Sequence, residues 1–402
     1  MRLFCFLYFF KFVAMNFILF DDNEIRQNLF PITLTRPVAE IRVGIVTIKE
    51  KWEYFLKTSV SFLTENYLQQ KFPTKFETEN IYINSAVCPD QAIVEKIISL
   101  KENEKIIFEG IVIAFKTSEN KQFPLSSLEK YKNISFDQAL TVITQLWDIF
   151  LKNGEQLRKD FIWLTKNKIS QPINDQHTKI YFPENIFIEE GVHIRAAILN
   201  AEPGPIYIGK NAIIQEGSII RGAFAMLEGV HLNMGSKMRG DITIGPFCKV
   251  GGEVSNTVFF GYSNKSHEGF LGNSVVCEWC NFGADTNSSN MKNDYGNVKL
   301  WNYPKNKMVD TGRQFCGLIM GDHSKAGINT MFNTGTVVGV NCNVFGEGFP
   351  DNFVPSFSWG GKNYEKYRLE KALQVAKITM ARRDKVFDDI EKNILEYIFQ
   401  HS

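Results

Sequence analysis

A six-residue repeat constrains the fold of this chain more than any other feature. Apolar residues recur at this spacing from about residue 186 to residue 344, and a second register of apolar or small residues lies two positions earlier. Neither an α-helix nor a simple sheet has this period. The repeat therefore predicts a left-handed parallel β-helix of hexapeptide repeats, in which three hexads close one triangular coil and stacked coils bury an apolar column. One stretch of the first register reads Ile208, Ile214, Ile220, Met226, Leu232, Met238, Ile244 and Val250.

Composition narrows the class of protein. The chain has 402 residues, of which 44% are hydrophobic and 22% are charged, so it has the composition of a globular protein and room for two or three domains. A net charge of +1 argues against a nucleic-acid partner, because phosphate binding requires a basic excess. The seven cysteines follow no disulfide spacing, which favours the reducing cytoplasm. We expect no membrane partner.

The segments on either side of the repeat predict two further parts. Residues 15–175 alternate strands with helices, including a helix from Phe136 to Leu151, and predict an α/β domain. The β-helix is expected over residues 180–350 and a C-terminal α-helical arm over residues 360–402. Residues 1–14 are apolar apart from Arg2 and Lys11 and are too short to span a bilayer. They are either a signal peptide or a mis-called start before Met15, and we favour the second interpretation.

Polar residues follow the predicted strands of the α/β domain. Open α/β sheets bind ligands at the carboxyl ends of their strands, and arginine suits phosphate because its guanidinium donates in a fork. The residues in these positions predict a nucleotide site: Asp21, Asp22, Arg36, Arg42 and Asn84. The alternative for Arg36 and Arg42 is a structural ion pair.

The hexads break twice, over residues 263–272 and 281–299, where the chain becomes polar. Loops on a rigid scaffold are where function concentrates. His267 lies in the first break, and its imidazole is a suitable base for an amine that attacks a carbonyl. Asn281 follows fourteen residues later, close to one coil, so we expect it beside or above His267. Asparagine can bind a sugar hydroxyl or an oxyanion.

Counting hexads places His193, His231 and His267 on one face of the solenoid. Two coils separate His231 from His267, which is about 10 Å and too far for one shared metal ion. We therefore predict no metal ion shared by these histidines, and structural roles for His193 and His231. Cys277 and Cys280 form a Cys-x-x-Cys pair without a second pair, and we interpret them as structural.

At these positions the chain resembles the bifunctional UDP-N-acetylglucosamine diphosphorylases/glucosamine-1-phosphate N-acetyltransferases. The motifs that carry the resemblance are His267-Glu-Gly-Phe-Leu-Gly-Asn273, Asn281-Phe-Gly-Ala-Asp285 and Asn293-Asp-Tyr-Gly-Asn-Val-Lys299. Farther upstream, Asp21 to Arg26 stands where the family has a glycine-rich phosphate loop, and Thr35-Arg36-Pro37 stands in place of its Pro-Lys-Pro.

The resemblance implies a transferase of sugar-nucleotide biosynthesis. His267 would be the base of acetyl transfer from acetyl-CoA to an amino-sugar 1-phosphate, and Asn329 and Thr330 would line the coenzyme A groove. The N-terminal domain, including Arg26, would join a nucleoside triphosphate to a sugar 1-phosphate with Mg²⁺, and the β-helix would form a homotrimer. The resemblance further implies a substrate-binding set: Lys265, Phe270, Asn281, Asn290, Asn293, Tyr295 and Lys299.

Two alternatives stay open on the sequence. The missing glycine loop favours an acyltransferase whose N-terminal domain binds a sugar nucleotide without turning it over. The regular repeat is also compatible with a non-enzymatic trimeric scaffold.

Overall fold

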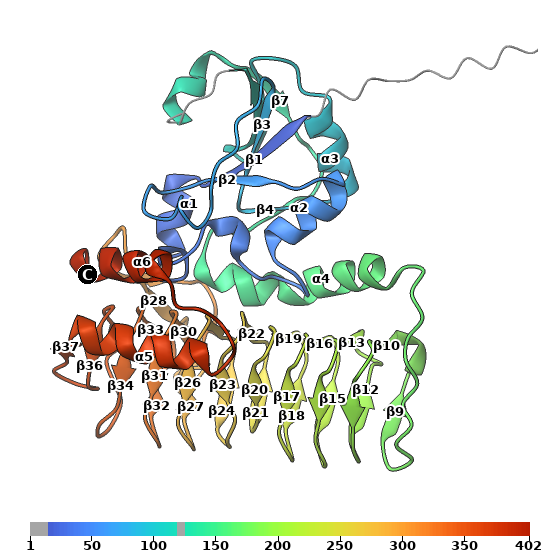
Figure 1. Cartoon of the computed structure of the whole chain (residues 1–402), viewed down its shortest axis with the longest axis vertical. Helices are drawn as coiled ribbons and strands as arrows, with labels where there is room; N and C mark the ends of the chain where they lie inside the picture. Colours follow the sequence, from blue (N-terminus) through green and yellow to red (C-terminus); the bar gives the residue numbers. More distant parts are fainter. Residues whose placement is uncertain (1–14, 119–124) are drawn as a thin grey trace, which may run out of the picture.

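The computed structural model describes residues 15–118 and 125–402, and it places an α/β layer on one side of a β-solenoid (Figure 1). Our expectation for residues 1–14 lies outside the described residues. The N-terminal sheet has the order β2-β1-β3-β6-β5-β7, in which β1 is parallel to β2 and β3, and β3 is antiparallel to β6. Its strands are β1 (Asn16–Phe20), β2 (Ser61–Leu63), β3 (Asn80–Asn84), β5 (Glu104–Phe108), β6 (Ile111–Thr117) and β7 (Lys132–Ser135), with a separate pair of β4 (Val87–Cys88) and β8 (Thr141–Val142).

Capping residues set where the helices of this layer begin. Thr47 accepts from the backbone N–H of Glu50, whose carboxylate accepts in return from Thr47, and this capping box starts α2 (Ile48–Leu56). The helix expected from Phe136 is α4 (Leu146–Thr165), which starts ten residues later, because Gln145 and Asp148 form its capping box. The other helices of this layer are α1 (Asn23–Asn28) and α3 (Gln91–Ile98).

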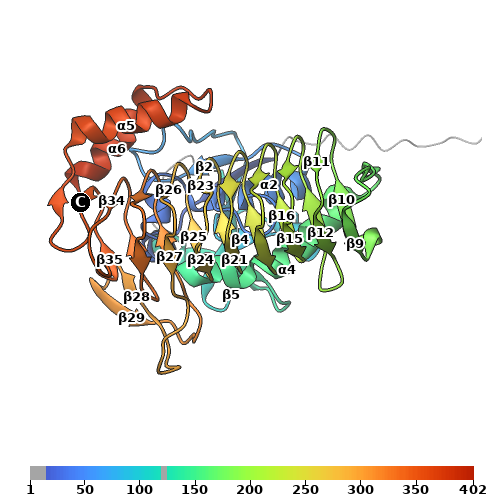
Figure 2. The same ribbon diagram turned by 90° about the horizontal axis from the view of Figure 1, so that it is seen from below.

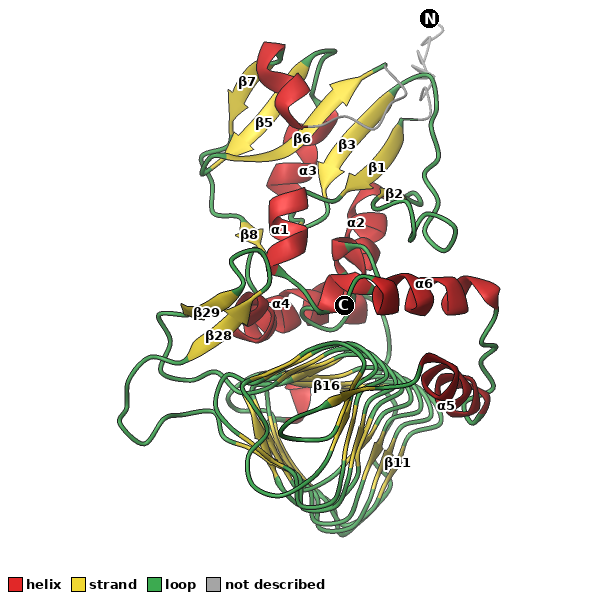
Figure 3. Ribbon diagram, turned by 90° about the vertical axis from the view of Figure 1, so that its left-hand side faces the viewer, coloured by secondary structure: helices red, strands yellow, loops and turns green. Residues whose placement is uncertain are grey.

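The solenoid is a parallel β-helix with three sheets, which enclose the triangle seen end-on in Figure 3. We name them by what each faces. The domain-side sheet contains β10 (Ile186–Ile188), β13 (Ile206–Ile208), β16 (Phe224–Met226), β19 (Ile242–Ile244), β22 (Val258–Phe259), β25 (Val275–Val276), β30 (Ile319–Met320), β33 (Val337–Val338) and β35 (Phe353–Val354). The arm-side sheet contains β11 (His193–Ile194), β14 (Ile213–Ile214), β17 (His231–Leu232), β20 (Lys249–Val250), β23 (Asn264–Lys265), β26 (Asn281–Phe282), β31 (Lys325–Ala326), β34 (Asn343–Val344), β36 (Ser358–Trp359) and β37 (Glu365–Lys366). The third sheet contains β9 (Lys179–Tyr181), β12 (Ile198–Asn200), β15 (Ile219–Arg221), β18 (Lys237–Arg239), β21 (Glu253–Ser255), β24 (Phe270–Gly272), β27 (Asn287–Ser288) and β32 (Met331–Phe332).

The strand register confirms the hexapeptide reading. Ile206 pairs with Phe224 and Phe224 with Ile242, so successive coils lie eighteen residues apart. Both apolar registers of the repeat point inward and form one buried column, which runs through almost the whole solenoid. The fold class expected from the sequence, an α/β domain followed by a β-helix and a helical arm, is confirmed.

Two departures from regularity shape the middle of the solenoid, whose stacked coils are seen from below in Figure 2. Thr243 pairs with Val258, only fifteen residues on, so this coil is short. Later, Val275 pairs with Ile319, and the extra residues leave the solenoid as an excursion between β27 and β30. The excursion contains an antiparallel hairpin of β28 (Lys299–Asn302) and β29 (Lys307–Asp310).

The C-terminal arm joins the two larger parts of the chain. It forms two helices, α5 (Leu369–Ala381) and α6 (Asp389–Gln400), rather than one continuous helix. Tyr397 of α6 stacks on Tyr67 of the N-terminal layer with ring centroids 3.9 Å apart. On its other side the arm packs against Val340 and Phe357 of the last coils. None of the helices in the described ranges has the length and apolar character needed to cross a membrane.

Candidate active site

His267 lies at a corner of the solenoid between β23 and β24, and its side chain is exposed. The single column of three histidines expected from counting is wrong. His193 and His231 share a column of the arm-side sheet that continues through Lys249 and Asn264. His267 stands three residues beyond this column, so it projects from the corner rather than from the sheet.

The short coil explains the displacement. His231 pairs with Lys249 eighteen residues on, whereas Lys249 pairs with Asn264 after only fifteen. The corner that follows β20 is reduced to Gly251 and Gly252. Glycine is needed there, because a Cβ on Gly251 would lie 2.3 Å from the carbonyl oxygen of the neighbouring corner. A count by hexads alone cannot register this deletion.

Asn281 does not lie beside or above His267, and that expectation is corrected. It pairs with Asn264 on the arm-side sheet, and Asn264 Nδ2 donates to Asn281 Oδ1 at 3.5 Å. The side chain of Asn281 is exposed. It is therefore separated from the His267 corner by the length of one short strand.

Lys265, expected to contact substrate, is only 2% exposed. It lies at an inward position of β23, paired with Val250. Its ammonium donates to the carbonyl oxygens of His267 at 2.7 Å and Glu268 at 3.3 Å. Burial lowers the pKa of Lys265 to about 8, against weaker attraction from Glu268 and Asp285 that raises it.

A hollow of about 650 Å³ lies on the third sheet, next to the base of the excursion. It contains two residues of the expected substrate-binding set, Phe270 and Asn290. Asn290 Nδ2 donates to Asn273 Oδ1 at 2.8 Å, and the backbone N–H of Phe270 donates to Asn287 Oδ1 at 2.8 Å. Gly272 leaves the space for this arrangement, because a Cβ there would lie 2.6 Å from the Phe270 ring. Two cationic residues that the sequence did not indicate, Arg239 and Arg313, also line this hollow.

A second hollow, of about 690 Å³, lies on the other side of the excursion. It is lined by Asn293 and Lys299, both members of the expected substrate-binding set. Lys292 Nζ pairs with Asp294 at 2.9 Å at its rim. Tyr295 lies at the exposed tip, 65% accessible, where its carbonyl accepts from Gln314. The excursion therefore separates the expected set into two neighbouring groups.

The expected coenzyme A residues, Asn329 and Thr330, form an ordinary corner of the solenoid. Asn329 adopts a left-handed backbone with φ of 57°, and its N–H donates to the carbonyl of Ala284 at 2.8 Å. Thr330 donates its hydroxyl to the carbonyl of Gly327 at 2.8 Å. The same residues can thus be explained by corner geometry alone.

In the N-terminal layer, the acidic residues after β1 are engaged within the protein. Asp21 accepts from the backbone N–H of Val38 at 3.0 Å and from the hydroxyl of Thr64 at 2.6 Å, and burial raises its pKa despite the nearby Arg26. Asp22 caps α1 by accepting from two backbone N–H groups.

Arg26 and Asn84 are engaged in the same way. Arg26 is buried and donates to the carbonyl of Thr33 and to the hydroxyl of Tyr67, each at 2.8 Å. Asn84 donates to the carbonyl of Val112 and accepts from Ala86. Four of the six residues of the predicted nucleotide site thus have internal partners in the N-terminal layer.

Arg36 and Arg42, the other two, reach across to the solenoid. Arg36 donates to Asp322 Oδ1 at 2.5 Å and lies 3.5 Å from Glu278 Oε2. Arg42 donates to the carbonyl of Phe260 at 3.3 Å and to that of Ile45 at 2.7 Å. The structural ion pair left open by the sequence is therefore present for Arg36.

Asp322 is the residue at this junction that sequence reasoning missed. Burial alone would raise its pKa, but the ion pair with Arg36, the hydrogen bond from Thr35 and the adjacent His323 together outweigh burial and hold the pKa below its ordinary value. Thr35 also donates to this carboxylate. The adjacent His323 is buried, and desolvation lowers its pKa to about 3, so its imidazole is neutral. The cavity beside these residues has a volume of about 160 Å³.

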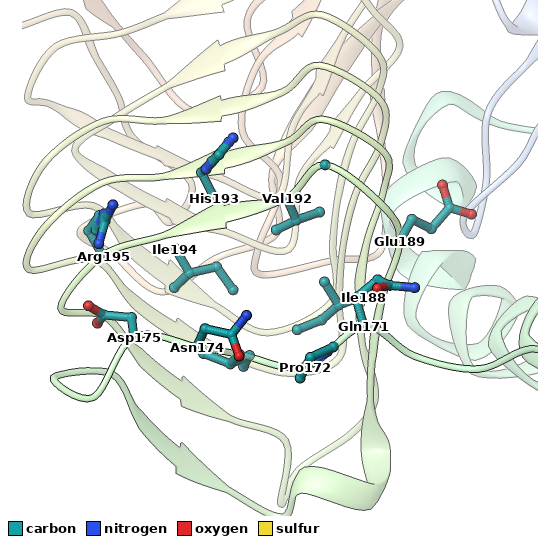
Figure 4. A pocket seen from close by; sticks show the side chains of 12 residues that line it. Gln171, Pro172, Asn174, Asp175, Ile188, Glu189, Val192, His193, Ile194 and Arg195 are labelled. Atoms are coloured by element: carbon teal, nitrogen blue, oxygen red, sulfur yellow. The ribbon is translucent and has the colours of Figure 1, made fainter.

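One more hollow, of about 350 Å³, lies at the open first coil of the solenoid (Figure 4). His193 and Arg195 border it, and Ile173 and Ile194 line its apolar part. It lies at the end of the solenoid far from the His267 corner. Within residues 15–118 and 125–402, no group of three or more histidine, cysteine or acidic side chains is arranged to hold a metal ion.

Comparisons with known proteins agree with the sequence reading of the N-terminal layer. Residues 17–169 match the family described as sugar nucleotidyl transferase. The chain is 37% identical over 90 residues to the bifunctional protein GlmU of Methanocaldococcus jannaschii, which covers 22% of this chain and 21% of that protein. It is 32% identical over 93 residues to a bifunctional sugar-1-phosphate nucleotidylyltransferase/acetyltransferase of Sulfurisphaera tokodaii, covering 23% of each chain.

These matches span about a fifth of the length of the curated relatives. Among solved structures, the chain is similar to the polySia-specific acetyltransferase NeuO at 13% identity with a TM-score of 0.29, over 52% of this chain and 95% of the other. It is also similar to an Arabidopsis UDP-N-acetylglucosamine acyltransferase at 14% identity with a TM-score of 0.22, over 54% and 80%. The matches to the nucleotidyl transferase family and to its bifunctional relatives confirm the resemblance that the sequence motifs indicated.

Proposed function

We propose that this protein is a sugar-nucleotide biosynthesis transferase whose solenoid transfers an acetyl group from acetyl-CoA to an amino-sugar 1-phosphate. The observation that carries the proposal is the exposed His267 at the corner between β23 and β24, which follows the short coil. This corner lies in the part of the solenoid where the excursion and its two hollows interrupt the repeat. Regular coils need no such corner to pack.

The chemistry follows from the residue types. The amine nitrogen of the sugar attacks the thioester carbonyl carbon, the new C–N bond forms, and the C–S bond breaks to release coenzyme A. His267 accepts the proton that the amine loses, and the thiolate is protonated as it leaves. Arg239 and Arg313 supply positive charge suited to phosphate groups, and Asn290 and Asn293 supply amides suited to hydroxyls.

We further propose a homotrimer, in which the exposed corners of neighbouring copies meet, and a cytoplasmic setting. The six cysteines in the described residues are free and buried, which fits a reducing compartment.

For the N-terminal layer we propose nucleotidyl transfer onto a sugar 1-phosphate, supported by the family match over residues 17–169. The acidic residues after β1 do not fit the expected Mg²⁺. Both oxygens of Asp21 accept hydrogen bonds within the protein, and Asp22 caps a helix. We derive no step through the metal.

A second candidate is favoured by the burial of Arg36 and Arg42, which takes both guanidinium groups away from a ligand. In this candidate the N-terminal layer binds a sugar nucleotide without turnover. Calorimetry with UTP and dTTP, combined with a pyrophosphate-release assay, separates the two. Binding with pyrophosphate release supports nucleotidyl transfer, whereas binding without release supports the second candidate.

Acetyl transfer is tested with His267→Ala, assayed with acetyl-CoA and glucosamine 1-phosphate. Loss of a general base lowers turnover by about 10² to 10⁴-fold, so we expect a fall in this range. His193→Ala is the matched control, because His193 is also exposed but lies at the far end of the solenoid. Equal turnover of the two variants would remove His267 from the mechanism.

A further inference from the structure

The interior column of the arm-side sheet contains one charged residue. Lys265 occupies a position that is otherwise apolar, and it is 2% exposed. The inward residues of the other coils in this column are Ile194, Ile214, Leu232, Val250, Phe282, Ala326 and Val344. An apolar side chain would fill the position without the cost of burying an ammonium group. Stability of the column therefore does not account for a lysine here.

The corner above Lys265 also differs from its neighbours. In the next two coils a threonine hydroxyl closes the corner, Thr286 donating to the carbonyl of Gly283 and Thr330 to that of Gly327, each at 2.8 Å. The corresponding residue in the His267 corner is Gly269, which has no hydroxyl and adopts φ of 119°. The usual side-chain closure is therefore absent from this corner.

In the His267 corner, Lys265 supplies from inside the solenoid the side-chain hydrogen bonds that a threonine hydroxyl supplies in the next two coils. Its ammonium donates to the carbonyls of His267 and Glu268, and Asn233 Nδ2 donates to the preceding carbonyl, that of Ser266, at 2.7 Å. Three successive carbonyls are thus held by side chains from within the solenoid wall. With the backbone carbonyl of His267 fixed inward, its imidazole is left on the outside.

The backbone of the His267 corner is tightly packed at two glycines, Gly252 and Gly269. A Cβ on Gly252 would lie 3.0 Å from the carbonyl oxygen of His267, and a Cβ on Gly269 would lie 2.2 Å from that of Thr286. The backbone of the corner is therefore packed against the coils on both sides. Removing the ammonium leaves two part-buried carbonyls without their side-chain donor, and the corner can satisfy them by turning them toward solvent.

We propose that Lys265 is a positioning residue for His267, which fixes the corner from the solenoid interior so that the imidazole points toward bound substrate. This rests on the proposed acetyl transfer. The consequence is specific: loss of Lys265 lowers turnover and changes the environment of the His267 ring, while binding of acetyl-CoA elsewhere on the solenoid is retained.

The test is Lys265→Met, which keeps the length of the side chain and removes the ammonium. We expect kcat to fall about tenfold, because small displacements of a catalytic group cost one to two orders of magnitude, with KM for acetyl-CoA unchanged. The imidazole carbon-bound proton signals of His267, assigned with His267→Ala, should shift or broaden. Leu232→Met is the control in the same column, and it should change neither quantity.

The outcomes separate this inference from the proposed function. If His267→Ala keeps full turnover, the function fails, and the His267 signals of Lys265→Met still decide whether the lysine positions the ring. If Lys265→Met is folded and both kcat and the His267 signals match the wild type, the inference is overturned. Should Lys265→Met fail to fold, Lys265→Arg replaces it: retained signals and turnover within about threefold support the inference, and unshifted signals with lost turnover overturn it.

Discussion

The predicted nucleotide site of the N-terminal layer, which we call the N-terminal edge, and the His267 corner were both predicted from polar residues that gather where regular elements end. The two regions differ in whether those polar residues have partners within the protein. At the N-terminal edge all six predicted residues bond to other parts of the protein, and Arg36 does so across to the solenoid. At the corner His267 is exposed, and Phe270, Asn290, Asn293 and Lys299 line open hollows. Polar clustering at element ends is therefore ambiguous until the partners of each group are known.

The difference lies in what packs against each region. The core of the N-terminal layer is continuous with outward residues of the domain-side sheet, such as Val258 and Val275. Any polar residue at that junction must find a partner inside the protein, because an unpaired charge there would be costly. The hairpin of the excursion also packs against the N-terminal layer, where Asn302 donates to Asn28 at 3.0 Å. The loop before the hairpin, which includes Asn293 and Tyr295, is exposed, so its polar residues can meet solvent or ligand.

The largest predicted effect concerns the interdomain ion pair. Asp322→Asn leaves the buried Arg36 without its main partner, and removing one partner of a buried pair costs about 3–5 kcal/mol. We expect a loss of this size in the free energy of unfolding, measured with urea. Arg158→Met is the control, because its pair with Asp241 is about 40% exposed on both sides and should matter by less than about 1 kcal/mol.

The stability of Asp322→Asn also tests whether the N-terminal edge and the His267 corner really differ. Equal effects of the two substitutions would mean that Arg36 is not committed to the solenoid. The guanidinium would then be free for a nucleotide, as the sequence first indicated, and the two regions would no longer differ in kind.

The next effect concerns Lys265 and depends on pH. Burial lowers the pKa of Lys265 to about 8 from its ordinary value of 10.5. Below pH 8 both states are protonated, and the folded state bears the cost of the buried ammonium. Between about pH 8 and 10.5 the folded lysine loses its proton while the unfolded chain keeps it, so unfolding takes up a proton and stability rises with pH.

Relative to Lys265→Met, the wild type should therefore gain up to about 3 kcal/mol in the free energy of unfolding across this window. Denaturant unfolding at pH 7 and pH 10.5 measures the difference. The same comparison with Leu232→Met should stay flat, since neither residue titrates. If the difference in unfolding free energy between the wild type and Lys265→Met does not change with pH, the Lys265 ammonium is hydrated in the folded protein. The corner would then have no internal donor.

Sequence patterns predicted the solenoid well because its period is local. Each inward position, such as Leu232, lies between the equivalent positions of the two adjacent coils, Ile214 and Val250, which are only eighteen residues away along the chain. The site was harder to predict, because a three-residue deletion in the coil before His267 changed which residues face each other and moved Asn281 to another column. The partner of Arg36 could not be found at all, since Asp322 lies far along the chain and becomes adjacent only when the layer docks on the solenoid.

The smallest effect sharpens the comparison at the N-terminal edge. Asp22 accepts from the N–H groups of Glu24 and Ile25 at 3.0 and 3.1 Å, which is the role of a helix N-cap. Replacing such a cap with alanine costs about 1 kcal/mol, so Asp22→Ala should lower the free energy of unfolding by that amount. Asp90→Ala, which removes the cap of α3, is a control with the same expected cost. If UTP or dTTP stabilises the wild type in a thermal-shift assay, both variants should keep this stabilisation, because a carboxylate that serves a helix has no ligand to lose. Loss of the nucleotide effect in Asp22→Ala alone would return this edge to the class of binding sites and would leave the structural role of Asp22 as the smaller part of its contribution.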